Sequence, residues 1–263
     1  MGEFPHSVKG TLNFAADRND GGRFSAFTGD ASQNLLPVEV DILNMRSLPQ
    51  SPTLEAEGFV IASHPVAAPD WKDDAWVASV YVPSCVELVK RLTGAAAALQ
   101  MYTPIFRTRQ PDGRAAVAAG FIHFDQPREQ YRGTAEAYAA EQGVKLGRAA
   151  IYNVWKSATP PPQDLPLAIS DRRTVAAADH VIGVSYGSYG EAAHVKLARS
   201  DAQPTWYYVP DLALDESLVF LAADFDPSHP LGCPHAAFSA PPVGGGGYVP
   251  RTSIEVRVLA CFD

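Results

Sequence analysis

Residues 121–125 read Phe121-Ile122-His123-Phe124-Asp125, a short apolar run interrupted by two side chains that can bind a metal ion. In a β-strand, residues i and i+2 point to the same face, so His123 and Asp125 would project together. A neutral imidazole and a carboxylate on one face supply two of the three ligands of a 2-His-1-carboxylate metal site. The pair alone can arise by chance, so the rest of the chain has to decide.

The C-terminal part of the chain carries a further histidine and an Arg-x-Ser pair. His235 lies 110 residues after Asp125 and can return as the third ligand if the strands close into a barrel. Arg251 and Ser253 share a strand face by the same period of two. A guanidinium beside a hydroxyl suits a bidentate clamp on a carboxylate, which predicts an anion-binding position.

Short motifs in a fixed order carry a family resemblance over nearly the whole chain. They lie at residues 38–40, 46, 57–59, 80–81, 92–95, 152–156, 164–168, 171, 206–208, 215–216, 225–226, 235–238 and 251–257. The chain resembles the non-haem Fe(II)/2-oxoglutarate-dependent hydroxylases and desaturases that include the CmcJ-, AsaB- and TqaL-like proteins and the gibberellin desaturase-like proteins. It departs from many members at Lys156-Ser157, where they carry Arg-Pro, and at Thr205, where they carry His.

The resemblance implies a cofactor and a role for each candidate residue. Fe(II) would be held by His123, Asp125 and His235, and the distal carboxylate of 2-oxoglutarate by Arg251 and Ser253, with O2 as cosubstrate. Asn153 and Lys156 lie on opposite parities of one strand and are candidates for the pocket and for its rim or the cosubstrate. The expected reaction is hydroxylation, desaturation or oxidative cyclisation at a C–H bond of a small secondary metabolite or an amino-acid-like molecule.

Two other functions are compatible with the same residues. One is a catalytically inactive jelly-roll accessory or binding subunit of a tailoring complex, and the other is a metal-dependent hydrolase or isomerase on a cupin-like barrel. His229 is the most serious rival for the third ligand position. Residues 251–257 also allow two readings, because their alternation fits a half-exposed strand as well as a polar face turned inward. Under either reading Arg257 is expected to be a passive neighbour of Arg251.

Composition restricts the class of protein. Hydrophobic residues make up 46% and charged residues 19% of 263 residues, as in an ordinary globular protein. A net charge of −8 argues against a nucleic-acid partner. No apolar run approaches the ~18 residues of a membrane span, and no secretory signal pattern is present, so a cytoplasmic location is expected. The three cysteines are an odd number without zinc spacing, which predicts reduced thiols.

The pattern of elements predicts a mainly β fold with flanking helices around a double-stranded β-helix (jelly-roll, cupin-like) core. We expect one domain over residues 1–263, with an N-terminal elaboration of strands and a helix in 1–110 and the jelly roll with its metal site in 111–263. Helical spacing occurs within 74–98, interrupted by Pro83, and in 129–142 before Gly143. Short β-rich runs follow from Ala149 onward, separated by Pro and Gly. The glycine-rich segment 241–247 is expected to be a mobile loop, either a plain surface connection or a lid that closes over the substrate.

Overall fold

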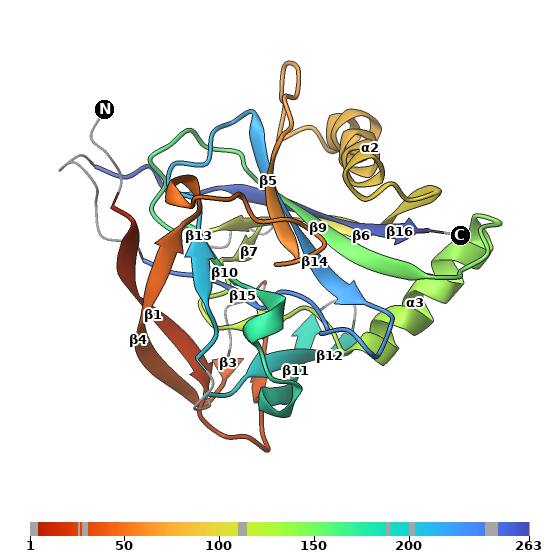
Figure 1. Cartoon of the computed structure of the whole chain (residues 1–263). Coiled ribbons are helices and arrows are strands. Elements are labelled where there is room, and N and C mark those ends of the chain that lie inside the picture. The colour runs from red at the N-terminus through yellow and green to blue at the C-terminus, as the bar shows by residue number, and fades with distance from the viewer. Residues whose placement is uncertain are drawn as a thin grey trace.

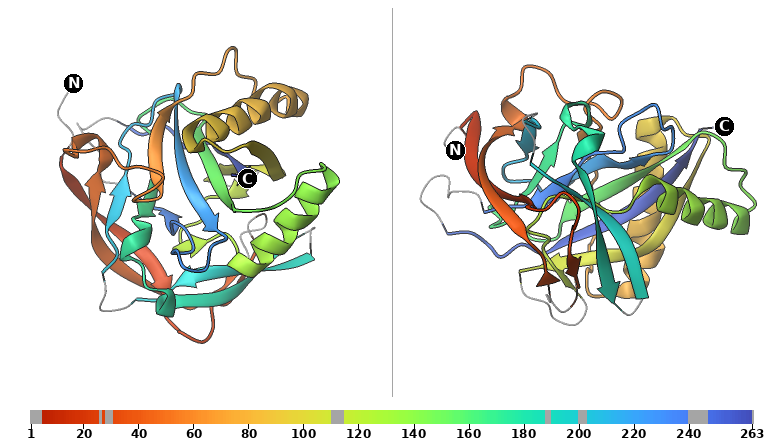
Figure 2. Two further views of the ribbon diagram at one scale, coloured as in Figure 1. Left: turned by 45° about the vertical axis from the view of Figure 1, so that its right-hand side comes forward. Right: turned by 90° about the horizontal axis from the view of Figure 1, so that it is seen from below.

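Two facing β-sheets form the body of the protein in the computed structural model (Figures 1 and 2), which describes residues 5–25, 27, 31–109, 115–187, 190–199, 203–239 and 247–262. Within these residues the larger sheet has ten strands, in the order β1 (Ser7–Ala15), β4 (Leu35–Asn44), β13 (Trp206–Tyr208), β10 (Leu167–Ser170), β15 (His235–Ala237), β8 (His123–Phe124), β12 (Gly190–Leu197), β11 (His180–Gly187), β2 (Arg23–Phe24) and β3 (Ala31–Ser32). The smaller sheet has six, in the order β5 (Phe59–Ser63), β14 (Glu216–Asp224), β9 (Ala149–Ser157), β16 (Ser253–Cys261), β6 (Ala97–Thr108) and β7 (Ala116–Val117). Most neighbouring strands are antiparallel. The predicted mainly β class is confirmed.

Strands from both ends of the sequence are interleaved in both sheets. β1 and β4 join the larger sheet through β13, and β6 pairs with β16 in the smaller one. Strand β9 lies between β14 and β16, and all nine of its residues are buried. A central strand covered on both faces is buried along its whole length, so residues of both parities are enclosed.

One long helical stretch covers the outer face of the smaller sheet (Figure 2). It begins with α1 (Asp74–Trp76), continues through a π-helical segment (Val77–Tyr81) and ends with α2 (Val82–Thr93). The π segment ends two residues before Pro83. Because proline has no N–H to donate in the helix, the predicted interruption takes the form of a local widening of the helix. Gly94 ends the helix with φ 68°, as a left-handed cap requires.

The second helix, α3 (Arg128–Glu141), packs against β14 and β6 near the ends of both strands. Its bounds agree with the prediction for 129–142, and Gly143 follows with φ 66°. Single turns of 3-10 helix occur at Met45–Ser47, Arg172–Thr174 and Ala177–Asp179. The part of the chain described here has no helix with the length and apolar character needed to cross a membrane. All three cysteines are buried, and no disulfide joins them in the described part of the chain.

Candidate metal centre

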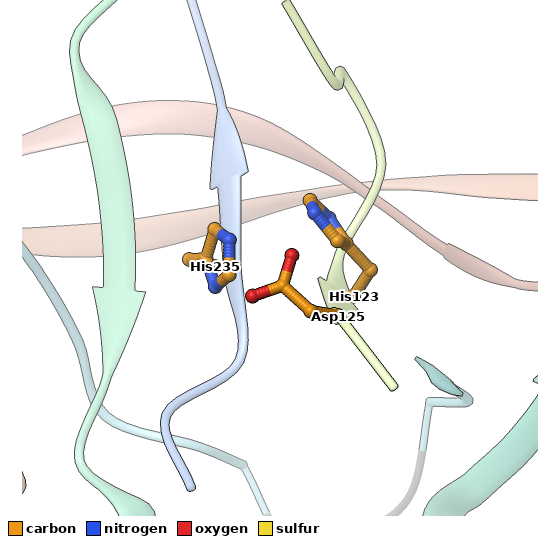
Figure 3. A group of neighbouring side chains, drawn as sticks. All are labelled: His123, Asp125 and His235. Atoms are coloured by element: carbon orange, nitrogen blue, oxygen red, sulfur yellow. The ribbon is translucent and has the colours of Figure 1, made fainter. Parts of the chain in front are cut away.

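Two histidines from neighbouring strands face one another between the sheets. His123 of β8 and His235 of β15 are paired in register, which places both side chains on the same face. Their ring centroids lie 4.4 Å apart. Asp125 follows β8 and points to the same place (Figure 3), so that one ligand atom from each of the three residues lies within 4.8 Å of the others. We call these residues the His–Asp–His cluster. The structure brings together the three ligands predicted from the sequence.

Backbone carbonyls fix the tautomer of both histidines. The Nδ1 atom of His123 lies 3.0 Å from the carbonyl oxygen of Phe121, and Nδ1 of His235 lies 3.2 Å from that of Cys233. A carbonyl can only accept, so each Nδ1 carries the proton and each Nε2 keeps a free lone pair. Burial lowers the pKa of His123, and the neighbouring His235 lowers it further. Neutral imidazoles with free Nε2 atoms are the form that binds a metal ion.

Two donors from the smaller sheet hold the carboxylate of Asp125. Asn153 Nδ2 donates to Oδ2 over 2.8 Å, and Arg257 Nη2 donates to Oδ1 over 2.6 Å. Asn153 and Arg257 are register partners on β9 and β16, so they approach Asp125 as a pair. Burial raises the pKa of Asp125, but Arg257, the two cluster histidines and the hydrogen bond from Asn153 together outweigh this effect and hold that pKa well below its ordinary range. The carboxylate is therefore ionised and fixed in orientation, as a metal ligand requires.

Arg257 is thus not the passive neighbour that the sequence suggested. Its guanidinium forms an ion pair with Asp125 and a second contact of 3.1 Å with Glu255 Oε1. The residues of one parity on this strand, Arg251, Ser253 and Glu255, are at most 3% exposed. The polar face of residues 251–257 is therefore the inner face, and the half-exposed alternative is wrong.

Arg251 and Ser253 present unused hydrogen-bonding groups inside the protein. The Arg251 backbone N–H donates to Asp164 Oδ1 over 2.8 Å, and one side-chain nitrogen donates to the Leu165 carbonyl oxygen. Among the described residues, Arg251 Nε and Ser253 Oγ are buried with no hydrogen-bond partner. Burial lowers the pKa of Arg251 to about 10, and the charge of Arg107 contributes in the same direction. A buried cation and hydroxyl with spare capacity fit a carboxylate ligand.

The immediate surroundings of Arg251 are aromatic and nearly closed. Its guanidinium carbon lies 5.3 Å from the centroid of the Trp155 ring. A cavity of about 10 Å³, room for about one water molecule, lies between these two residues and the side chains around them. Arg107 on β6 is paired in register with Ser253, and its charge also lowers the pKa of His123. Arg107 is therefore near both the clamp residues and the His–Asp–His cluster, a position that no sequence motif indicated.

Lys156 is not brought to this site. It lies on the opposite face of β9 from Asn153, and its ammonium donates to the carbonyl oxygens of His64 and Glu216 over 2.9 and 3.0 Å. The rival ligand His229 also lies apart from the cluster, with a half-exposed side chain whose Nδ1 is 2.9 Å from Asp224 Oδ2. The expected mobile loop lies outside the described residues for its positions 241–246.

Comparison with known proteins places this site in a family. Residues 12–261 match the family model described as "Oxidoreductase/YMDC permease-like domain", and the chain belongs to this family. The Fe(II)/2-oxoglutarate-dependent dioxygenase nvfI of Aspergillus novofumigatus is 30% identical over 71% of this chain and 68% of its own length. The alpha-ketoglutarate-dependent dioxygenase phiK of a fungal species is 28% identical over 98% of this chain and its whole length.

Solved structures share the fold. A structure of the iron and alpha-ketoglutarate-dependent endoperoxidase NvfI superimposes with a TM-score of 0.80 at 24% identity, covering 97% of this chain and 98% of that one. The expected jelly-roll architecture is confirmed by this likeness. The chain is therefore a member of a family of mainly β oxidoreductases, with a buried 2-His-1-carboxylate cluster between its two sheets.

Proposed function

We propose that this protein is an Fe(II)/2-oxoglutarate-dependent oxygenase that hydroxylates, desaturates or cyclises a small organic molecule. The observation that carries the proposal is the convergence of two histidines with free Nε2 atoms on one ionised carboxylate. Dioxygenase relatives that match most of the chain, and the hydroxylase/desaturase efuI of Hormonema carpetanum at 25% identity over 98% of this chain, support the same chemistry. We also propose that the chain belongs to the narrower group of CmcJ-, AsaB- and TqaL-like proteins that its motifs resemble.

Each inner-face residue has a role in this proposal. The His–Asp–His cluster holds Fe(II), while Asn153 and Arg257 fix the orientation of its carboxylate. Arg251 and Ser253 bind the distal carboxylate of 2-oxoglutarate, since both carry buried groups with unused hydrogen-bonding capacity among the described residues. Arg107 adds positive charge near both positions. When bound, iron and 2-oxoglutarate would supply oxidative decarboxylation coupled to O2 activation beside a substrate C–H bond.

The chain itself contributes enclosure and orientation. The cluster histidines are at most 5% exposed, so bulk water is kept from the reacting centre. We leave Lys156 out of the cosubstrate site, because its ammonium is engaged by two carbonyls on the other face of β9. We also propose a single domain, since strands from residues 1–110 are hydrogen-bonded into both sheets.

Anaerobic addition of Fe(II) and 2-oxoglutarate tests this function without knowledge of the substrate. Chelation of 2-oxoglutarate by the bound iron gives a visible charge-transfer band, and admission of O2 should then release succinate. Zn(II)-dependent turnover without O2 would favour the hydrolase or isomerase alternative. A charge-transfer band without any succinate, even with candidate substrates, would favour the inactive accessory protein. Absence of the band would contradict the proposal.

A further inference from the structure

The inner face of the larger sheet continues beyond the His–Asp–His cluster onto β12. Lys196 is the register partner of His123, so its side chain emerges on the same face and beside that histidine. His194 is two residues earlier on β12 and therefore shares this face. Neither residue has a part in iron or 2-oxoglutarate binding as proposed above.

Lys196 is a buried cation with spare donors. Lys196 is 1% exposed, and its Nζ donates to Gln33 Oε1. The same nitrogen lies 4.6 Å from the centroid of the Phe121 ring, which is 5.2 Å from the ring of His123. An ammonium has three donors; Gln33 accepts from one of them, and the other two have no hydrogen-bond partner within the described residues. Asp20 acts on Lys196 through its charge, but the two form no ion pair in the described parts of the chain.

His194 is a buried imidazole whose two nitrogens are both unused. It is 2% exposed, and neither Nδ1 nor Nε2 has a hydrogen-bond partner among the residues that the structure describes. Its ring packs against Phe24 at 4.8 Å and Phe121 at 6.0 Å between centroids. Burial lowers the pKa of His194 to about 3, so the ring is neutral and offers one donor and one acceptor. Buried polar groups without partners are unusual in folded proteins and call for an explanation.

We propose that Lys196 and His194 form a subsite for a carboxylate of the organic substrate, with Phe24 and Phe121 packing against its apolar or aromatic body. The spare N–H groups of an ammonium and an imidazole on one sheet face match the oxygens of one carboxylate. The subsite is distinct from the proposed cosubstrate clamp, because Ser253 begins strand β16 of the smaller sheet and Arg251 lies two residues before it. This inference rests on the proposed function, since it names the substrate class of the same active site.

The second buried lysine shows what a purely structural role looks like. Lys156 is also 1% exposed, and burial lowers the pKa of both lysines to about 8. The ammonium of Lys156, however, is held by two backbone carbonyls. Lys156→Met is therefore a matched control that removes a buried ammonium on the opposite side of the smaller sheet.

Calorimetric titration of the metal-free protein with 3-phenylpropionate and with its neutral amide, 3-phenylpropanamide, tests the subsite. Lys196→Met should weaken binding of the carboxylate at least tenfold, leave binding of the amide unchanged and leave the melting temperature equal or higher. His194→Leu should weaken carboxylate binding in the same direction, which covers the case in which Lys196→Met does not fold. Lys156→Met should bind the carboxylate like the wild type and melt at a lower temperature.

Three outcomes would overturn the proposal. In the first, the wild type does not bind 3-phenylpropionate. In the second, the wild type and Lys196→Met bind it with equal affinity. In the third, only Arg251→Ala loses binding, which would place the probe in the cosubstrate clamp. Failure of the proposed function is seen separately, as absence of the charge-transfer band and of succinate in the iron-loaded protein. The titration uses no iron, so the two results can be told apart.

Discussion

Replacement of Arg257 by leucine removes the charge that neutralises Asp125 inside the protein. The two side chains are 11% and 4% exposed, and Nη2 lies 2.6 Å from Oδ1, so the carboxylate has little contact with bulk water that could replace the lost charge. A bound divalent cation can replace it. We therefore expect the metal-free variant to lose much more stability than the metal-bound variant, because the ion takes over the neutralisation of Asp125.

The size of the effect follows from the burial of the pair. Removal of one member of a buried ion pair costs about 3–5 kcal/mol, because it leaves an uncompensated charge. Asn153 still donates to the carboxylate, which favours the lower part of this range, whereas Glu255 loses the same guanidinium. For a chain of this length, 1 kcal/mol corresponds to about 2 °C in melting temperature, so the metal-free variant should melt roughly 6–10 °C below the wild type.

Scanning calorimetry after EDTA treatment, with and without Mn(II) as a redox-stable substitute for Fe(II), measures both states. Mn(II) should restore a large share of the deficit of Arg257→Leu while adding less to the wild type. Lys9→Met is the control for loss of an exposed ion pair, since Lys9 and Asp41 are 60% and 63% exposed, and it should leave the melting temperature unchanged. An equal deficit with and without Mn(II) would refute the reasoning, because it would mean that Arg257 acts through packing alone.

Three further changes test the rest of the site. Alanine at any position of the His–Asp–His cluster should abolish Fe(II) binding by equilibrium dialysis, whereas His229→Ala should retain it; the reverse result would show that the third ligand is wrong. Arg251→Ala should keep iron but weaken 2-oxoglutarate binding by about 2–5 kcal/mol, measured as a higher 2-oxoglutarate concentration for the charge-transfer band, and Arg251→Lys should restore part of the binding. An unchanged 2-oxoglutarate requirement would place the clamp elsewhere. Gly58→Ala should lower the free energy of unfolding, measured by urea titration, by about 2–4 kcal/mol, because φ at this position is +93° and a Cβ atom would lie 2.5 Å from Cys233 Sγ. An unchanged free energy of unfolding would show that this contact relaxes freely.

Local patterns in the sequence predicted most of the elements but not their neighbours. Both long helices and most of the strands after Ala149 were predicted to within a few residues, because periodicity and the capping glycines are local signals. Strand β6 was missed because its residues do not alternate between buried and exposed, as it pairs with β16 along a bulged register. Strand β12 was missed as well, although it carries two buried polar residues of the inner face.

The candidate site was predictable to the extent that it depends on spacing within a strand. His123 and Asp125 follow from the period of two, whereas His235 required the resemblance, since contact across 110 residues leaves no local trace. The contact between Arg257 and Asp125 depends on which side chains of the smaller sheet face the cluster. The register between β9 and β16, which are far apart in the sequence, decides this. Parity could not assign Lys156 either, because β9 is buried on both faces.

The charges on the inner faces show what the interior is arranged to receive. The chain as a whole has a net charge of −8, yet cations outnumber carboxylates around the His–Asp–His cluster, where the charged residues are Arg107, Arg251, Arg257, Lys196, Asp125 and Glu255. Asp164 beside Arg251 is already paired with Arg109. Arg257 contacts both inner carboxylates, whereas Arg251, Arg107 and Lys196 form no ion pair among the described residues. Arg251 and Lys196 are buried, and buried cations without an ion-pair partner cost free energy. Bound anions would lower this cost, so the two proposals above are consistent with each other: they place a dicarboxylate cosubstrate at Arg251 and a carboxylate of the substrate at Lys196.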